Sequence, residues 1–239
     1  MIFAIISDVH ANLEAVDACF KRIDEIKPDR IICLGDLVDY CAQPNEVVEI
    51  IKSRCDVVTL GNHDEAQFNY SLSDGFSDNA RISSTHTRTQ LNREHIDYFR
   101  TLHLTHSEQD MRFVHASPLL PHKYKYVLTE ERAAENFQAF KERICFIGHS
   151  HIPVIYEEHE SAAHKVDHTS VRKDRRYIVN VGSIGQPRDG NPKLCFGVFD
   201  SNKFEFRYER VEYDIKKASD KILAAGLPEF LSERLYKGV

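Results

Sequence analysis

Short apolar runs, rich in β-branched and aromatic residues, recur along this sequence and are predicted to form buried strands. They span Ile2–Ile6, Ile31–Leu34, Val57–Leu60, Met111–Val114, Ile144–Ile147, Tyr177–Val181, Leu194–Phe199 and Phe204–Val211. Helical patterns separate the early runs and begin at Asn12, Pro44 and Thr129, which are residues typical of helix N-termini. Strands that alternate with helices favour parallel βαβ units, whereas the later runs lack intervening helices and favour antiparallel hairpins. The pattern therefore predicts a mixed-sheet, layered α/β or α+β fold.

Some segments depart from this pattern. Residues 65–110 are polar, with helix starts at Ser77 and Asn92, and are predicted to be a helical insertion beside the site. Residues 157–176 are charged and rich in Ser and His, which indicates a surface loop. Residues 214–239 are predicted to be a helical tail, interrupted at Gly226 and restarted after Pro228. Because no internal repeat or linker stands out, we expect one domain over residues 1–239.

The composition is that of an ordinary globular protein and excludes some classes of partner. The net charge of −6 over 239 residues gives no basic footprint for nucleic acid. The apolar N-terminal run meets Asp8 too early for a signal peptide or a membrane span. The six cysteines form no C-x-x-C pair, which indicates buried thiols in a reducing cytoplasm. The oligomeric state is left open.

Polar side chains follow the predicted strands at the point where each strand ends. They are Asp8 and His10, then Asp36, then Asn62, His63 and Asp64, then His115, and finally His149 and His151. Ligands of open α/β sheets gather at the carboxyl ends of strands, so we expect these side chains to converge on one rim. Taken alone, a cluster of this kind most often has a structural explanation: its residues form a turn, place an imidazole on the surface, or include a hydrogen-bonded histidine in the core. Their joint occurrence favours a metal site.

Two metal ions suit this set better than one, because the donors exceed what one first-row ion binds. Asp36 is a carboxylate and can bridge two ions. Oxygen and nitrogen donors without thiolate favour Mn, Fe, Co, Ni or Zn in a catalytic site. His149 and His151 are two residues apart, so in an extended chain they would face the rim together, one toward each ion. Paired ions about 3.5–4 Å apart clamp a phosphoryl group and generate hydroxide near neutral pH.

In their order along the chain, these motifs resemble those of the calcineurin-like metallophosphoesterases. The matching residues are Asp8-Val9-His10, Gly35-Asp36-x-x-Asp39, Gly61-Asn62-His63-Asp64, His115 and Gly148-His149-Ser150-His151. Residues 180–190 and 210–215 are similar to a bacterial subgroup of phosphodiesterases related to diadenosine tetraphosphatase. The resemblance implies a four-layer αββα sandwich, with a dinuclear site between the loops of the two sheets.

The resemblance also implies a role for each site residue. Asp8, His10, Asp36 and His151 would hold the first ion, and Asp36, Asn62, His115 and His149 the second, with Mn the favoured metal. His63 would lie near the leaving group and protonate it or stabilise its charge. Asp64 and Asp39 would assist catalysis by orienting histidines, the alternative being helix caps or turn residues. Arg188 would contact a substrate phosphate, the alternative being a solvated loop side chain.

The preferred hypothesis is a dinuclear-metal-dependent phosphoesterase, in particular a phosphodiesterase that uses a metal-bridging hydroxide to hydrolyse a small phosphoester. An alternative is a pyrophosphohydrolase of diadenosine polyphosphates or other nucleotides, in which residues 65–110 hold the bases. A third hypothesis is a non-catalytic metal-binding scaffold, similar to the retromer scaffold subunit. The complete donor set together with His63 argues against the scaffold.

Overall fold

The computed structural model describes residues 1–168 and 171–239, and their strands form two mixed sheets. The first sheet contains β1 (Ile2–Ile6), β2 (Arg30–Cys33), β3 (Val57–Val58), β10 (Leu194–Asp200) and β11 (Glu205–Val211), in the order β11-β10-β1-β2-β3. The second contains β4 (Thr105–Glu108), β5 (Met111–Val114), β6 (Ile144–Ile147), β7 (Val154–His159), β8 (Ala162–Val166) and β9 (Tyr177–Asn180), in the order β4-β5-β6-β9-β7-β8. As predicted, early strands pair in parallel and β10 pairs with β11 antiparallel.

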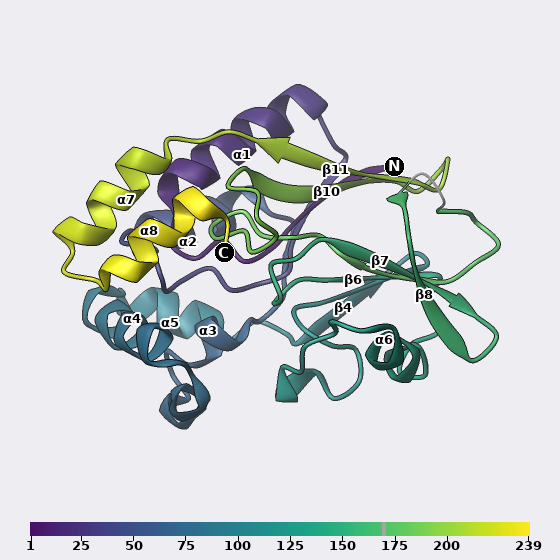
Figure 1. Cartoon of the computed structure of the whole chain (residues 1–239), viewed down its shortest axis with the longest axis horizontal. Helices are drawn as coiled ribbons and strands as arrows, with labels where there is room; N and C mark the ends of the chain where they lie inside the picture. Colours follow the sequence, from purple (N-terminus) through teal and green to yellow (C-terminus); the bar gives the residue numbers. More distant parts are fainter. Residues whose placement is uncertain (169–170) are drawn as a thin grey trace.

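The helices cover the outer faces of the two sheets and one end of the sandwich. They are α1 (Leu13–Ile26), α2 (Pro44–Arg54), α3 (Asn62–Glu65), η1 (Tyr70–Gly75), α4 (Asp78–Gln90), α5 (Arg93–Phe99), η2 (Pro121–Lys123), α6 (Glu130–Phe137), α7 (Ile215–Ala224) and α8 (Glu229–Lys237). Figure 1 shows α1 above the first sheet, the second sheet beneath it, and α6 below the second sheet. This arrangement confirms the predicted four-layer αββα sandwich.

The alternation of side chains along β1 explains the layers. Phe3 and Ile5 point into the apolar core between the two sheets, whereas Ala4 and Ile6 point into the core beneath α1 and α2. Because successive strand residues face opposite sides, a strand that is apolar throughout must be buried on both faces. A third core lies between the second sheet and the inner face of α6, which carries Phe137.

Side-chain caps start the helices where the sequence predicts. The Asn12 side chain accepts a hydrogen bond from the Ala15 N–H at 3.2 Å, and the Thr129 hydroxyl accepts one from the Arg132 N–H at 3.3 Å. Each satisfies a donor that the first helical turn leaves without an intrahelical partner. Pro44 occupies the first position of α2, where a missing N–H has no consequence.

Some boundaries differ from the sequence-based predictions. The segment 65–110 contains η1, α4 and α5 as predicted, but it ends in the strand β4. The surface loop predicted over 157–176 is wrong in its first part, because β7 continues to His159 and pairs with β8 in an antiparallel hairpin. This hairpin lies at the sheet edge and carries exposed polar residues, so it lacks the apolar signal of a buried strand. Residues 169–170 of that predicted loop lie outside the described residues.

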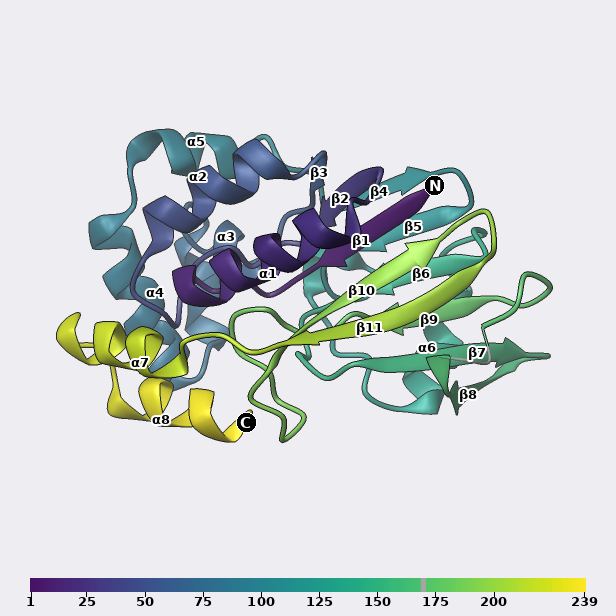
Figure 2. The ribbon, with the colours of Figure 1, turned by 90° about the horizontal axis from the view of Figure 1, so that it is seen from above.

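Helices also gather at the end of the sandwich where β1 terminates. Figures 1 and 2 place α3, α4, α7 and α8 at this same end, and α7 and α8 share an apolar cluster with Tyr40 and Ala80. Residues 214–239 contain these two helices, and Gly226 lies in the break between them. Within the described residues, each helix is too short or too polar to cross a membrane. All six cysteines are free, and all but Cys55 are buried.

Candidate metal centre

Several predicted ligands sit on backbone that turns sharply at the carboxyl ends of strands. The φ angles are 53° for Asp8, 50° for His10, 55° for Asp36, 65° for His149 and 60° for His151. Non-glycine residues rarely adopt this left-handed region, and such strain is concentrated at functional sites. The extended conformation expected for residues 149–151 is therefore wrong. The two histidines nevertheless lie in two different groups of donor side chains.

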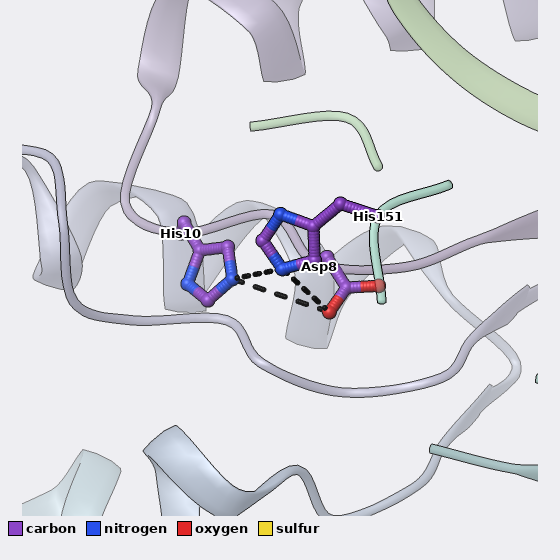
Figure 3. A group of neighbouring side chains, drawn as sticks. All are labelled: Asp8, His10 and His151. Carbon is purple, nitrogen blue, oxygen red and sulfur yellow. Dashed lines mark hydrogen bonds and ion pairs between the residues drawn. The ribbon is translucent and has the colours of Figure 1, made fainter. Parts of the chain in front are cut away.

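The first group consists of Asp8, His10 and His151, which come from two distant parts of the chain (Figure 3). The Nε2 atoms of His10 and His151 are 3.1 Å apart. Asp8 Oδ1 lies 3.2 Å from Nε2 of His151 and 4.0 Å from Nε2 of His10. All three side chains are buried, so a carboxylate and two imidazoles converge on one point without access to bulk water.

Hydrogen bonds at the far side of each ring fix the tautomer in this group. Nδ1 of His10 lies 2.9 Å from the Val38 carbonyl oxygen, and Nδ1 of His151 lies 2.6 Å from the Gln186 carbonyl oxygen. Since a carbonyl only accepts, each Nδ1 carries the proton and each Nε2 carries a lone pair. Two lone pairs and a carboxylate that face one another repel, and a cation between them removes the repulsion. The donor set therefore fits a divalent metal.

The second group consists of Asp36, Asn62, His115 and His149. The Nε2 atom of His115 lies 3.2 Å from each of three donor atoms: Asp36 Oδ2, Asn62 Oδ1 and His149 Nδ1. Its Nδ1 donates to the carbonyl oxygen of Leu34 at 3.0 Å, so Nε2 is the ring atom that faces the other donors. Asp36 Oδ2 is also 3.8 Å from Nε2 of His10, which places this carboxylate between the two groups.

Burial keeps most of these histidines neutral. Burial, with neighbouring histidines, lowers the pKa of His10 well below its usual value and the pKa of His149 to about 3. Burial, together with the nearby Arg188, lowers the pKa of His151 to about 4. His115 behaves differently: burial lowers its pKa, but Asp36 and other carboxylates outweigh this and raise it to about 9. Neutral imidazoles are the form that binds metal, and a metal ion at His115 must displace a proton.

His63 lies beside the two groups and is held by Asp39. Its Nδ1 is 2.7 Å from Asp39 Oδ2, and the amide of Gln67 donates to the other Asp39 oxygen at 3.1 Å. Burial lowers the pKa of His63, but Asp36 and Asp39 outweigh this and the net pKa is raised. Asp39 is thus placed to orient a histidine, as the sequence analysis expects.

Asp64 takes the alternative place given in the sequence analysis, that of a cap and turn residue, because its carboxylate binds backbone rather than a histidine. It accepts hydrogen bonds from the N–H groups of Asp36 and Leu37 at 2.8 Å each, and from Gly61 at 3.2 Å. Burial and the nearby Asp36 raise its pKa to about 7. Asp64 therefore ties the loop that carries Asp36 to the start of α3, and it takes no part in lining the cavity.

A cavity of about 480 Å³ opens over the centre and is within the usual size of a small-molecule site. Asn62, His63, His149 and the predicted substrate residue Arg188 line it. The other lining residues, which the sequence analysis did not identify, are Tyr40, Leu72, Gly75, Phe76, Ser77, Ala80, Lys123, Tyr124, Tyr126 and Arg234.

Aromatic rings form much of the cavity wall. The Tyr126 ring stacks on His149 with centroids 4.2 Å apart, and the Phe76 ring lies 4.5 Å from that of His63. Tyr124 is held in place by a 2.6 Å hydrogen bond from its hydroxyl to Glu65. These side chains come from loops without periodicity, and the only available signal was the cluster of Tyr and Lys at residues 123–126.

Comparison with known proteins agrees with this geometry. A family model described as the calcineurin-like phosphoesterase superfamily domain matches residues 1–203. The uncharacterized protein MJ0912 of Methanocaldococcus jannaschii is 36% identical over 241 residues, which cover 99% of this chain and 98% of that protein.

Two solved structures share the architecture. The metallophosphoesterase of Sphaerobacter thermophilus superposes with a TM-score of 0.87 at 37% identity, covering 100% of this chain and 99% of the other. The hypothetical protein PH1004 of Pyrococcus horikoshii has a TM-score of 0.81 at 21% identity, covers 100% of this chain and 98% of the other, and shows the same fold. The chain belongs to the calcineurin-like phosphoesterase superfamily and is a metal-dependent phosphoester hydrolase.

Proposed function

We propose that this protein is a phosphodiesterase that works with two divalent ions, Mn²⁺ being the favoured metal. The observation that carries the proposal is the convergence of two adjacent groups of lone-pair donors, with Asp36 between them, below a cavity lined by His63. Oxygen and imidazole donors without thiolate suit Mn²⁺ and similar first-row ions.

In this proposal the residues divide into two ligand sets that share Asp36. Asp8, His10, Asp36 and His151 would hold one ion, and Asp36, Asn62, His115 and His149 would hold the other. Such a pair of ions, when bound, lowers the pKa of water and offsets the charge of the phosphoryl oxygens. The buried hydrogen bonds from Nδ1 of His10, His115 and His151 to carbonyl oxygens support this scheme, because they hold the rings in the metal-binding tautomer.

His63 would donate a proton to the leaving oxygen. Asp36 and Asp39 raise the pKa of His63, which favours the protonated imidazole, and the contact with Asp39 holds Nδ1, so Nε2 is the atom left for the substrate. An alkoxide leaving group of a diester needs such a proton, and general-acid catalysis contributes roughly 10²–10⁴-fold. A phosphodiester is favoured over a small monoester because the cavity extends well beyond the centre, with room for a second substituent.

A second candidate function is hydrolysis of a dinucleotide polyphosphate such as diadenosine tetraphosphate. The aromatic side chains of Phe76, Tyr124 and Tyr126 in the cavity wall favour it, since aromatic rings stack on nucleobases. The non-catalytic scaffold is disfavoured by the position of His63, which lines the cavity rather than packing into a core.

We also propose that residues 1–239 work as one domain in the cytoplasm. Side chains from residues 65–110, including Phe76, and from the C-terminal helices, including Arg234, line the same cavity as His149. The free cysteines support a reducing compartment.

Turnover of defined esters after metal exchange tests the function. The purified protein is stripped with a chelator, reloaded with Mn²⁺, and assayed on bis(4-nitrophenyl) phosphate, 4-nitrophenyl phosphate and diadenosine tetraphosphate. We expect activity to vanish with the metal, to return with Mn²⁺, and to be highest on the diester. Asp36→Asn should be inactive, whereas His159→Asn, an exposed histidine on β7, serves as the matched control. Full activity of the stripped protein or of Asp36→Asn would refute the proposal.

A further inference from the structure

Two arginines line the cavity from different parts of the chain. Arg188 follows β9 in the loop that leads to β10, and Arg234 lies on α8. Arg234 lies outside residues 1–203, the part that the family model matches. Membership of the family therefore does not explain why an arginine lines the cavity at this position. Both residues are half-buried, and both line the cavity.

Neither arginine pairs with an Asp or Glu side chain among the residues that the structure describes. Arg188 donates from Nε and Nη2 to the side-chain oxygen of Gln186, at 3.3 and 2.8 Å. Arg234 donates from Nε to the main-chain oxygen of Val239. Asp189, the carboxylate beside Arg188 in sequence, pairs with Arg210 instead. The two guanidinium groups thus line the cavity without pairing to an Asp or Glu side chain of the described residues.

Backbone contacts hold the two arginines in one unit. The Gly190 N–H donates to the Gly238 carbonyl at 2.8 Å, which ties the loop of Arg188 to the end of α8. Gly238 has a φ of 65°, and a Cβ added there would meet the backbone of Asn191 at 2.6 Å, so the approach requires glycine. The same loop reaches the metal centre, because the Arg188 N–H donates to the His151 carbonyl at 3.2 Å.

The positive charges of Arg188 and Arg234 repel each other, and a bound anion would offset this repulsion. Burial and the neighbouring Arg188 lower the pKa of Arg234 to about 10. A phosphate dianion matches the combined charge of two guanidinium groups, and its oxygens suit their planar donor geometry.

We propose that Arg188 and Arg234 form a second anion subsite, which binds a phosphate group of the substrate other than the one that is hydrolysed. The inference rests on the proposed function, since it places this subsite beside the reacting ester. It defines the substrate class as phosphodiesters that carry an additional phosphate monoester, such as esters of a nucleoside 5′-phosphate that also bear a 3′-phosphate.

A matched pair of substrates tests the subsite. The 4-nitrophenyl ester of thymidine 5′-phosphate and its 3′-phosphorylated derivative share the nucleoside, the scissile bond and the leaving group. We expect the Mn²⁺-loaded protein to favour the 3′-phosphorylated ester by about tenfold or more in kcat/KM, the size of a charge-assisted hydrogen bond or two. The ratio of kcat/KM for the 3′-phosphorylated ester to kcat/KM for the unphosphorylated ester should fall close to one in Arg234→Met and in Arg188→Met. Arg234→Lys should keep part of the preference.

The control for lost charge is Lys237→Met, an exposed residue on the same helix that pairs with Glu233 at 3.4 Å. It should keep both the activity and the ratio of the unchanged protein. If Lys237→Met lowered this ratio of kcat/KM as much as Arg234→Met does, the subsite would be overturned. The preference would then depend on the overall charge of the protein and not on Arg234. A ratio near one in the unchanged protein would also overturn it.

Binding gives a readout that is independent of turnover. Calorimetric titration should show that thymidine 3′,5′-bisphosphate binds at least tenfold more tightly than thymidine 5′-monophosphate, and that Arg234→Met abolishes the difference. If neither ester is hydrolysed while this difference in binding is present, the proposed activity fails and the anion subsite stands. If both esters are hydrolysed while the two nucleotides bind equally, the anion subsite fails and the proposed activity stands.

Discussion

The Nδ1 atom of His63 lies 2.7 Å from Oδ2 of Asp39, and both side chains are buried beside the candidate metal centre. Asp39 is held in turn by a hydrogen bond from Gln67, so the imidazole is locked in one orientation. The contact has two effects on His63. It fixes the ring, and it helps to raise the pKa of His63, which favours the protonated ring.

The first prediction is that Asp39→Asn changes the pH profile of hydrolysis. Asp39 raises the pKa of His63, so its loss lowers that pKa, and the protonated acid disappears at a lower pH. The alkaline limb of kcat/KM should therefore move to lower pH. On a diester with a phenyl leaving group the rate at pH 8 should fall by about tenfold or more, because proton donation is most needed there. A 4-nitrophenyl diester, whose leaving group needs little protonation, should be affected less.

Asp74→Asn, an exposed carboxylate in η1, is the matched control and should leave the profile in place. An unchanged alkaline limb in Asp39→Asn, with both leaving groups affected alike, would contradict the assignment of His63 as the proton donor.

The second prediction is that the two ligand groups can be emptied separately. Asp8, His10 and His151 form one cluster and Asp36, His115 and His149 another, so each histidine serves one ion. His151→Ala should lower the Mn²⁺ content from about two ions per chain to about one, since loss of a ligand weakens only its own site. His149→Ala should have the same effect on the other site, and Asp36→Asn should weaken both.

Metal content measured by mass spectrometry after dialysis checks this, with thermal unfolding recorded to show that each variant is folded. His159→Asn provides the control at an exposed histidine. If His151→Ala and His149→Ala both retained two ions, or both lost all metal, the division into two groups would be wrong.

The layers could be predicted from the sequence, and so could the polar side chains that gather at the strand ends, because both depend on local pattern. Strands such as β1 and β6 are apolar on both faces, and each ends at a polar cluster, so periodicity identifies the strand and its end identifies the candidate ligand. The edge hairpin of β7 and β8 was missed because exposed edge strands carry polar residues, which remove that signal.

The rest of the site depends on contacts between distant residues. The left-handed backbone at His149 and His151 is imposed by packing, so periodicity wrongly favoured an extended strand there. Asp64 looked like a partner for histidine, but its carboxylate binds the N–H groups of Asp36 and Leu37, which are nearly thirty positions away in sequence. Arg234 reaches the cavity only because α8 folds back over α4, which no local pattern predicts.

The third prediction concerns the proton on His115. In the absence of metal the pKa of His115 is raised to about 9 by Asp36, above its ordinary value of 6.5. The resulting ion pair stabilises the metal-free fold below about pH 6.5, and this contribution is lost as the pH rises through 9. Metal binding at pH 7.5 must therefore release about one proton, because His115 becomes neutral when it binds metal.

Calorimetric titration of Mn²⁺ in buffers of different ionisation enthalpy measures this release. We expect about one proton per chain at pH 7.5 and a much smaller value above pH 9.5, with apparent affinity rising over the same range. The other histidine ligands are already neutral, so they should add little. A proton release near zero at pH 7.5 would show that His115 is neutral before the metal binds.

The fourth prediction separates two glycines that differ in what surrounds them. A Cβ added at Gly148 would lie 2.0 Å from Ser7 Oγ and 2.5 Å from Asp8 Oδ2, whereas one added at Gly75 meets nothing within 4 Å. Gly148→Ala must therefore displace the Asp8 carboxylate, which accepts hydrogen bonds from the His149 N–H at 2.9 and 3.1 Å.

For Gly148→Ala we expect a loss of about 1–3 kcal/mol in the free energy of unfolding, as for other overpacked cores, and at least tenfold weaker binding of one Mn²⁺ ion. Gly75→Ala should leave both quantities unchanged, as measured by denaturant unfolding and metal titration. Equal metal affinity in the two variants would mean that the position of Asp8 does not depend on the absence of a side chain at residue 148.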